Sequence, residues 1–514
     1  MIQLQENGRI NKGIKNIING LVLQFISIGC NFATRYLLVH MLGKEAVGLN
    51  GLFTEVISML SLMEMGVGTA ITYNLYKPLT DKDEVKVGQL MRLFSHAYYI
   101  IAAAVLIIGG ALVPFIQLLI KDISAPLSYV RLIYFLFVCK TATSYLFAYK
   151  SMLLDADQKN YVSSRVNAGF KIVAVFADMI VLFATKSFVF FLITDAVFVT
   201  GSNILTAYLT DKHYPYLKRK TEKLPAGERR KVFANIKYLF ISTLSGKITN
   251  STDNILISKL ISTLQVGSYS NYSMIINAIS GITSKISGTL TGGVGNMMAT
   301  ESSEYCSAVL KRMTFIFYMA ASVCGVCLYC MLTPFVVIMF GKSYVLSAGV
   351  VFVSVVNFFL MVVRDPLWKI MTTSGLFRKD KNISIAGSLI NLVISIILGL
   401  KIGMVGIFLG TTATHVIQII LKIRLLYRER FHMKCGWYYI MFTKMTVIYF
   451  AEIAIAAYLC VLLPGWNMWI RFIAVGTISA LVPVAVNVLI YYRTSEFKYM
   501  VELFEKIVLK RKKA

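Results

Sequence analysis

The chain of 514 residues is 57% hydrophobic and only 15% charged, and its 52 Lys and Arg against 25 Asp and Glu give a net charge of +27. A soluble domain carries about 25% charged residues, so this composition excludes an ordinary soluble protein. Because the apolar residues form long stretches, the basic excess predicts contact with a membrane and not with nucleic acid.

About fourteen apolar stretches follow one another along the chain. Each is near the roughly 20 residues that a helix needs to cross the hydrocarbon core. The expected spans are 16–41, 48–76, 89–113, 128–149, 162–184, 187–210, 235–261, 265–298, 313–338, 346–375, 383–401, 404–427, 440–462 and 469–492. They predict an all-α polytopic membrane protein.

The connecting loops alternate between rich and poor in Lys and Arg. The linker 211–234 alone holds eight basic residues, whereas loops on the opposite side show about one each, such as Lys121 or Lys342. Basic loops stay on the cytosolic side, so an even number of crossings places both termini in the cytosol. No small-residue cleavage site follows the first span, which we expect to remain in the protein.

An internal repeat organises the spans. A shift of 219 residues pairs Asn16-Ile17 with Asn235-Ile236 and Val47-Gly48 with Val266-Gly267, which superposes spans one and two on spans seven and eight. Such parallel repeats are typical of transporters whose substrate path lies between the halves. The expected parts are an N-lobe 1–210, a basic linker 211–234, a C-lobe 235–434, two extra helices 435–492 and a basic amphipathic tail 493–514.

Ionisable residues inside the spans are the candidates for function, because each is costly in hydrocarbon and normally faces a cavity or a partner. The candidate cationic cavity residues are Arg35, Lys140, Lys171, Lys247, Lys285 and Arg364. The candidate coupling or pairing acids are Glu64, Asp178 and Asp253. Arg364-Asp365-Pro366 indicates either a break in span ten, as in broken transporter helices, or an ordinary kink with an interfacial Arg.

Two interpretations of the basic residues remain open. A cationic vestibule suits an anionic head such as a phosphate or pyrophosphate. Alternatively, Lys140 and Lys171 snorkel or pair with acids on neighbouring helices, for example Asp178 or Asp195. Arg35 and Lys247 are favoured for the cavity because they lie in the first helix of each repeat.

The sequence lacks the motifs of several classes of enzyme and of ATP-driven proteins. The chain has no G-x-x-x-x-G-K-[ST], no G-x-S-x-G and no cluster among its five His, so we expect neither nucleotide hydrolysis nor any cofactor. Cys324, Cys327 and Cys330 have a metal-like spacing but lie in an apolar span without partners, and we interpret them as packing residues. Energy is then expected from an ion gradient, the membrane potential or the substrate's own gradient.

Five short segments carry a family resemblance: Arg35-Tyr-Leu-Leu-Val-His-Met-Leu-Gly43, Val47-Gly48-Leu49, Met65-Gly-Val-Gly-Thr-Ala-Ile71, Asp155-Ala-Asp-Gln-Lys159 and Asp253-Asn-Ile-Leu-Ile257. They resemble the bacterial polysaccharide repeat-unit flippases, the Wzx-like exporters of the multidrug/oligosaccharidyl-lipid/polysaccharide (MOP) superfamily. The resemblance implies two six-helix lobes around a central cavity, with the last two helices alongside. It also implies alternating access that moves a polyprenyl-pyrophosphate-linked oligosaccharide from the inner to the outer leaflet for cell-surface polysaccharide assembly.

The same resemblance implies a place in the bacterial cytoplasmic membrane, in contact with its lipids. H⁺ and Na⁺ are the candidate coupling ions, and polysaccharide polymerase and glycosyltransferases are the candidate partner proteins. In that family, basic residues that line the cavity are expected to hold the pyrophosphate. The matching positions in this chain would be Arg35, Lys140, Lys171, Lys247 and Lys285. One alternative is a cation-coupled multidrug exporter of the same superfamily, using an acid such as Glu64 or Asp178. A membrane glycosyltransferase or acyltransferase is a further alternative, which would need a catalytic acid or His in an external loop.

Overall fold

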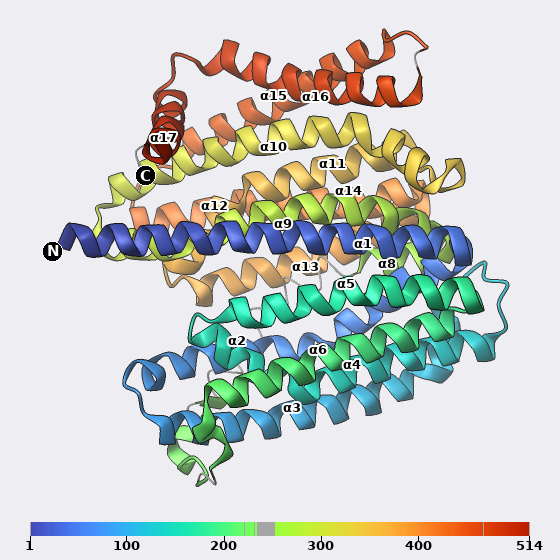
Figure 1. Ribbon diagram of the computed structural model, residues 1–514. Helices are drawn as coiled ribbons and strands as arrows, with labels where there is room; N and C mark the ends of the chain where they lie inside the picture. Colours follow the sequence, from blue (N-terminus) through green and yellow to red (C-terminus); the bar gives the residue numbers. More distant parts are fainter. Residues whose placement is uncertain (1, 220–221, 231, 234–251, 466, 513–514) are drawn as a thin grey trace. The chain divides into compact units, whose positions relative to one another are not determined.

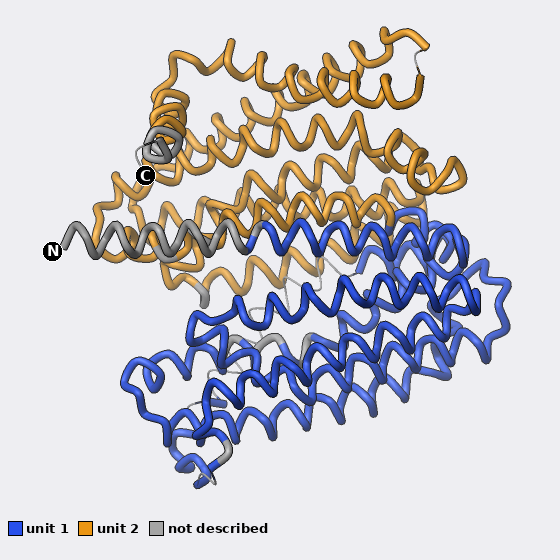
Figure 2. Tube along the Cα trace, viewed as in Figure 1, with its two compact units in different colours: residues 1–270 blue, residues 271–514 orange. Residues whose placement is uncertain are grey.

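The computed structural model describes residues 2–219, 222–230, 232–233, 252–465 and 467–512, and within these ranges the chain is almost entirely helical with no strand (Figure 1). Eleven helices in this part of the chain are long and apolar enough to cross a membrane. The predicted all-α polytopic fold is therefore confirmed, while the side on which the termini lie stays a prediction. The chain divides into two compact units, residues 1–270 and 271–514 (Figure 2).

The described residues of unit 1 form six long helices and shorter helical segments. Its elements are α1 (Ile2–Leu60), α2 (Leu62–Thr80), α3 (Glu84–Leu112), η1 (Val113–Leu118), α4 (Leu127–Ala156), α5 (Asn160–Thr185), α6 (Phe188–His213), η2 (Pro215–Lys218), α8 (Asp253–Leu256) and η3 (Ile257–Ile261). Helix α4 packs against α3 and α6, and α5 packs against α1 and α6. Most of predicted span seven, 235–261, lies outside the described residues.

Helix α1 contains the break expected between spans one and two. Gly43 has φ 77° and ψ −173°, a conformation that side chains rarely adopt, so the helix is interrupted there. Residues 44–60 then run towards α2 through a turn at Ser61, whose Oγ donates to the carbonyl of Ile57 at 2.9 Å. The second predicted span is thus a pair of helical segments.

The two Val-Gly dipeptides of the predicted repeat lie against each other within unit 1. A Cβ added to Gly48 would stand 2.4 Å from the carbonyl oxygen of Thr263, and one added to Gly267 would stand 3.0 Å from the nitrogen of Gly48. Val47 and Val266 beside them are fully buried. The glycines therefore allow a backbone contact that larger residues would prevent.

Unit 2 contains the remaining helices. Its elements are α9 (Thr263–Thr300), which begins in unit 1, then α10 (Ser303–Phe340), η4 (Lys342–Tyr344), α11 (Ala348–Val363), α12 (Asp365–Thr373), α13 (Phe377–Ile402), α14 (Met404–Leu426), η5 (Tyr427–Phe431), α15 (Gly436–Val461), α16 (Met468–Tyr491) and α17 (Ser495–Lys512). Helix α10 contacts α11, α15 and α16, and α14 packs against α11 and α13. The predicted break in span ten is found at Arg364, between α11 and α12.

Helices α13 and α14 form the tightest pair in unit 2. A Cβ on Gly406 would meet the carbonyl oxygen of Leu398 at 2.1 Å, and one on Gly410 would meet Ser395 Oγ at 2.1 Å. This Gly-x-x-x-Gly spacing brings two helix backbones together, as small residues do inside membranes.

A buried polar network joins α10, α15 and α16. Glu452 accepts from Ser322 Oγ at 2.5 Å and from Asn487 Nδ2 at 2.6 Å, while Tyr318 OH donates to Asn487 Oδ1 at 2.8 Å. Glu452 and Asn487 are both fully buried. Each polar group in an apolar interior needs such a partner, so the network attaches the two extra helices to α10.

We expect Asn487→Ala to destabilise the protein by about 1–3 kcal/mol, because it deprives Glu452 and Tyr318 of a buried partner. Thermal unfolding of the purified protein in detergent measures the loss. Thr477→Ala is the control, since this exposed hydroxyl on α16 donates only to its own helix, at the carbonyl of Ile473. Equal midpoints for both variants would contradict the structural role of the network.

We also expect Gly410→Ala to lower stability by about 1–3 kcal/mol, because the new methyl group must push α13 away from α14. Gly110→Ala is the matched control, as nothing lies within 4 Å of a Cβ there. Alanine is the better helix former, so the control should be neutral or stabilising in the same unfolding measurement.

Candidate functional site

A cluster of charged residues lies between the helices of unit 1. Lys140 of α4 forms an ion pair with Asp195 of α6, and both side chains are about a quarter to a third exposed. Asp195 is thus the acid on a neighbouring helix with which Lys140 pairs, while a cavity role for Lys140 stays a prediction. In an apolar bundle this pair holds α4 and α6 together while keeping both charges compensated.

Lys171 of α5 belongs to the same cluster. Its Nζ donates to Ser27 Oγ of α1 at 2.8 Å, and it lies within electrostatic range of Asp195 and Lys140. An ammonium group carries three donors, so one hydrogen bond to a hydroxyl leaves capacity for a further acceptor. Lys171 thus links α1 and α5 and retains the ability to bind an anionic group.

Asp178 lies seven residues after Lys171 on α5, two helical turns away on the same face. It is 3% exposed, and its Oδ1 has no hydrogen-bond partner among the described residues. Its electrostatic neighbours are Asp195 and Lys140. A buried carboxylate without a donor is unfavourable as a bare anion, so this position favours uptake of a proton or a small cation.

The charges of this cluster balance, with two lysines against two aspartates. Sequence reasoning had singled out Lys140, Lys171 and Asp178 and had offered Asp195 as a pairing partner. Because the four residues come from three helices, their proximity depends on how α4, α5 and α6 pack. The arrangement can hold an anion at Lys171 and a proton or cation at Asp178.

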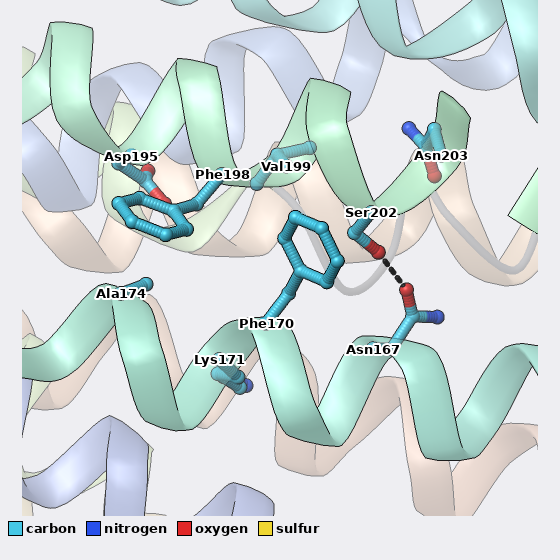
Figure 3. Close-up of a pocket in the computed structure, with 9 residues that line it drawn as sticks. All are labelled: Asn167, Phe170, Lys171, Ala174, Asp195, Phe198, Val199, Ser202 and Asn203. Carbon is cyan, nitrogen blue, oxygen red and sulfur yellow. Dashed lines mark hydrogen bonds between the residues drawn. The ribbon is translucent and has the colours of Figure 1, made fainter. Parts of the chain in front are cut away.

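A pocket of about 330 Å³ opens beside the cluster, between α5 and α6 (Figure 3). Lys171 and Asp195 line one part of it, while Asn167 and Ser202, joined by a hydrogen bond, line another. The ring of Phe170 stands between these two parts and forms an edge-to-face pair with the ring of Phe198, with centroids 6.4 Å apart. The pocket therefore offers charged, amide, hydroxyl and aromatic surfaces, the mixture typical of sites for amphipathic ligands.

The aromatic wall depends on a glycine. A Cβ on Gly201 of α6 would stand 2.8 Å from Cε1 of Phe170. Only the absence of a side chain lets the Phe170 ring lie against α6. Sequence inspection did not identify this role.

The other predicted residues of unit 1 lie elsewhere. Arg35 Nη1 donates to Ser270 Oγ at 3.5 Å, and Glu64 accepts from Tyr98 OH at 3.1 Å. Asp253 is the first residue of α8. Lys247 lies outside the described residues, so its role stays a prediction, as do those of Arg35, Glu64 and Asp253.

Arg364 occupies a second charged group, in unit 2. Its Nη1 donates to Nδ1 of His415 at 2.8 Å, and its guanidinium lies 4.4 Å from the ring centroid of Trp368. Arg364 can only donate, so His415 Nδ1 accepts and the imidazole proton resides on Nε2. Lys422 lies 4.4 Å from the same ring and pairs with Asp380 at 2.7 Å.

Sequence reasoning missed three members of this group, His415, Trp368 and Lys422. His415 and Lys422 are seven residues apart on α14, a spacing that places them on one face and is visible in the sequence. Lys285 is exposed on α9, and its role in a cavity stays a prediction.

Comparison with known proteins identifies the fold. Neither a family model nor a curated protein matches the sequence. Among solved structures, the lipid II flippase MurJ in an inward closed conformation has a TM-score of 0.67 at 13% identity, covering 92% of this chain and 98% of its own. An inward-facing multidrug resistance MATE family transporter of the MOP superfamily has a TM-score of 0.63 at 14% identity, covering 80% of this chain and 98% of its own.

A third structure, a complex of the MATE multidrug transporter DinF-BH, has a TM-score of 0.57 at 15% identity and covers 82% of this chain and 97% of its own. At these identities the likeness concerns the fold alone. The chain therefore has the multi-pass helical fold that the MATE transporters share with the lipid II flippase MurJ.

Proposed function

We propose that the chain is a MOP-superfamily flippase, not an enzyme, that moves polyprenyl-pyrophosphate-linked oligosaccharide repeat units from the inner to the outer leaflet of the bacterial cytoplasmic membrane by alternating access. The observation that carries this proposal is the match to MurJ over 92% of the chain. The Wzx-like segments of the sequence support an oligosaccharide as the cargo of the lipid carrier.

The share of the chain that each structure covers favours a flippase over a drug exporter. The MATE structure of similar TM-score covers 80% of the chain, against 92% for MurJ, a difference of 12 percentage points. The likeness to MurJ therefore extends over more of this chain than the likeness to the MATE structure does.

Lys171 is the residue of unit 1 best placed to receive a pyrophosphate. Phosphate oxygens prefer charged donors, and Lys acts on them as a point charge. Lys171 lines the pocket of Figure 3, and Ser27 holds its Nζ in place. The polar pair Asn167–Ser202 and the two Phe rings lie in the same pocket, where sugar hydroxyls and pyranose faces find suitable partners.

Asp178 is the proposed coupling residue. When a proton or Na⁺ binds its carboxyl group, one negative charge is neutralised next to the Lys140–Asp195 pair. Asp178 of α5 then attracts Lys140 less strongly, whereas Asp195 of α6 attracts Lys140 as before. An ion gradient in this way biases the packing of α4, α5 and α6 between two arrangements.

A cation-coupled multidrug exporter is the second candidate. The specific observation in its favour is that Asp195 lines the same pocket as Phe170 and Phe198, with Asp178 in the adjoining cluster, because acids and aromatic rings together attract organic cations. The match to several MATE multidrug transporters agrees with this alternative.

We expect Lys171→Gln to slow the transbilayer movement of a polyprenyl-pyrophosphate oligosaccharide in proteoliposomes by about tenfold or more, since a charge-assisted contact is lost. Lys186→Gln is the control, because this lysine ends α5 in an exposed position. Thermal unfolding shows that both variants are folded.

If the folded Lys171→Gln variant still moves the lipid-linked oligosaccharide rapidly, the flippase function stands, but Lys171 does not belong to the substrate site. If the intact protein moves none of several lipid-linked glycans but accumulates a cationic dye under an ion gradient, the drug exporter replaces the flippase.

We expect Asp178→Asn to abolish the acceleration of transport by an imposed H⁺ or Na⁺ gradient, because the amide binds neither ion as a carboxylate does. Transport by parent and variant is compared with and without each gradient. Asp122→Asn, in an exposed loop where Asn tolerates the positive φ of 58°, controls for loss of one negative charge. Undiminished acceleration in Asp178→Asn would exclude Asp178 as the coupling site.

A further inference from the structure

A second pocket, of about 350 Å³, lies within unit 1 between α3 and the basic linker. Helix α3 contributes Arg92 and His96 to its lining, and the linker contributes Lys223, Leu224, Arg229 and Phe233. Neither the transport cluster nor the pocket of Figure 3 includes any of these residues. The linker pocket, as we call it, therefore needs an explanation of its own.

Both walls of the linker pocket are held in place. Arg92 and His96 are one turn apart on an exposed face of α3, and His96 Nδ1 donates to the carbonyl of Arg92 at 2.7 Å, which leaves Nε2 for another partner. Across from them, the linker is attached to the start of α3 by the ion pairs Lys86–Glu228 and Arg219–Glu84.

The described lining of the linker pocket is strongly basic. Arg92, Lys223, Arg229 and the imidazole of His96 converge on it, and no acidic side chain is among the described residues that line it. Of the acids near it in the chain, Glu84 and Glu228 are engaged by Arg219 and Lys86, and the exposed Glu222 precedes Lys223 in the linker. This arrangement creates a positive potential suited to a phosphate group.

The linker pocket also has apolar surface and lies beside the lipid-facing part of α3. Phe233 is 50% exposed, and Leu224 of the same linker is buried. Beyond His96, α3 presents exposed apolar residues such as Ile100 and Ile107, at 69% and 72% exposure. Such a change from basic to apolar surface marks the level of lipid headgroups.

We propose that the linker pocket binds the phosphate of an anionic phospholipid. Arg92 and Arg229 hold the phosphate oxygens from opposite walls, Lys223 and His96 add further donors, and Phe233 contacts the start of an acyl chain. The bound lipid bridges α3 and the linker, so it adds to the ion pairs that attach the linker to unit 1. A free phosphate ester has the same charged group, but it lacks the chains that the apolar surface favours.

The test uses the full-length protein in nanodiscs of phosphatidylcholine with or without phosphatidylglycerol. Native mass spectrometry counts retained phosphatidylglycerol, and thermal unfolding reports stabilisation. We expect the double variant Arg92→Gln, Arg229→Gln to retain the lipid about tenfold less well, because two charge-assisted contacts are lost. The control is Lys77→Gln, Lys212→Gln, which removes two exposed charges from helix ends outside the pocket.

The outcomes separate the alternatives. Loss of lipid in the pocket variant but not in the control supports the proposal, whereas equal retention in all proteins, or equal loss in both variants, overturns it. If soluble glycerol phosphate in pure phosphatidylcholine stabilises the protein as much as phosphatidylglycerol does, the claim that the bound phosphate belongs to a lipid is overturned. If the double variant does not fold, the single variant Lys223→Gln, on the exposed linker, must lose lipid retention for the proposal to stand.

Discussion

The constraint on which the rest of this structure depends is that polar groups inside an apolar bundle must find partners within the protein. Glu452 finds its partners in Ser322 and Asn487, and Lys140 finds its partner in Asp195. These contacts are where helices join, because each partner comes from a different helix. Oδ1 of Asp178 is one of several buried polar atoms without a hydrogen-bond partner among the described residues, and because it belongs to an ionisable group this aspartate is a candidate for ion coupling.

Helix breaks and close helix contacts follow from the residue types at a few positions. Gly43 interrupts α1, and Arg364 followed by Asp365-Pro366 separates α11 from α12. Glycine is found where a helix backbone lies against a neighbouring segment, as at Gly48 and Gly410. Breaks of this kind are the positions at which helices most readily bend.

The two pockets of unit 1 suit different chemistry. The pocket beside Lys171 combines two opposite charges with amide, hydroxyl and aromatic groups, which fits an amphipathic substrate that must bind and leave. The linker pocket is basic throughout its described charged lining and adjoins lipid-facing surface, which fits a resident lipid. Transport and attachment of the linker would therefore use separate sites within one unit.

The sequence by itself determined the membrane class, most of the spans, the turn after span one and the break at Arg364, because hydrophobic length and helix-breaking residues act locally. It also identified Lys140, Lys171 and Asp178 as costly groups inside spans. Only the tertiary structure decided that Asp195 is the partner of Lys140, and that His415 joins Arg364. Such pairings depend on which helix faces meet, and helix packing is set by contacts between residues far apart in the chain.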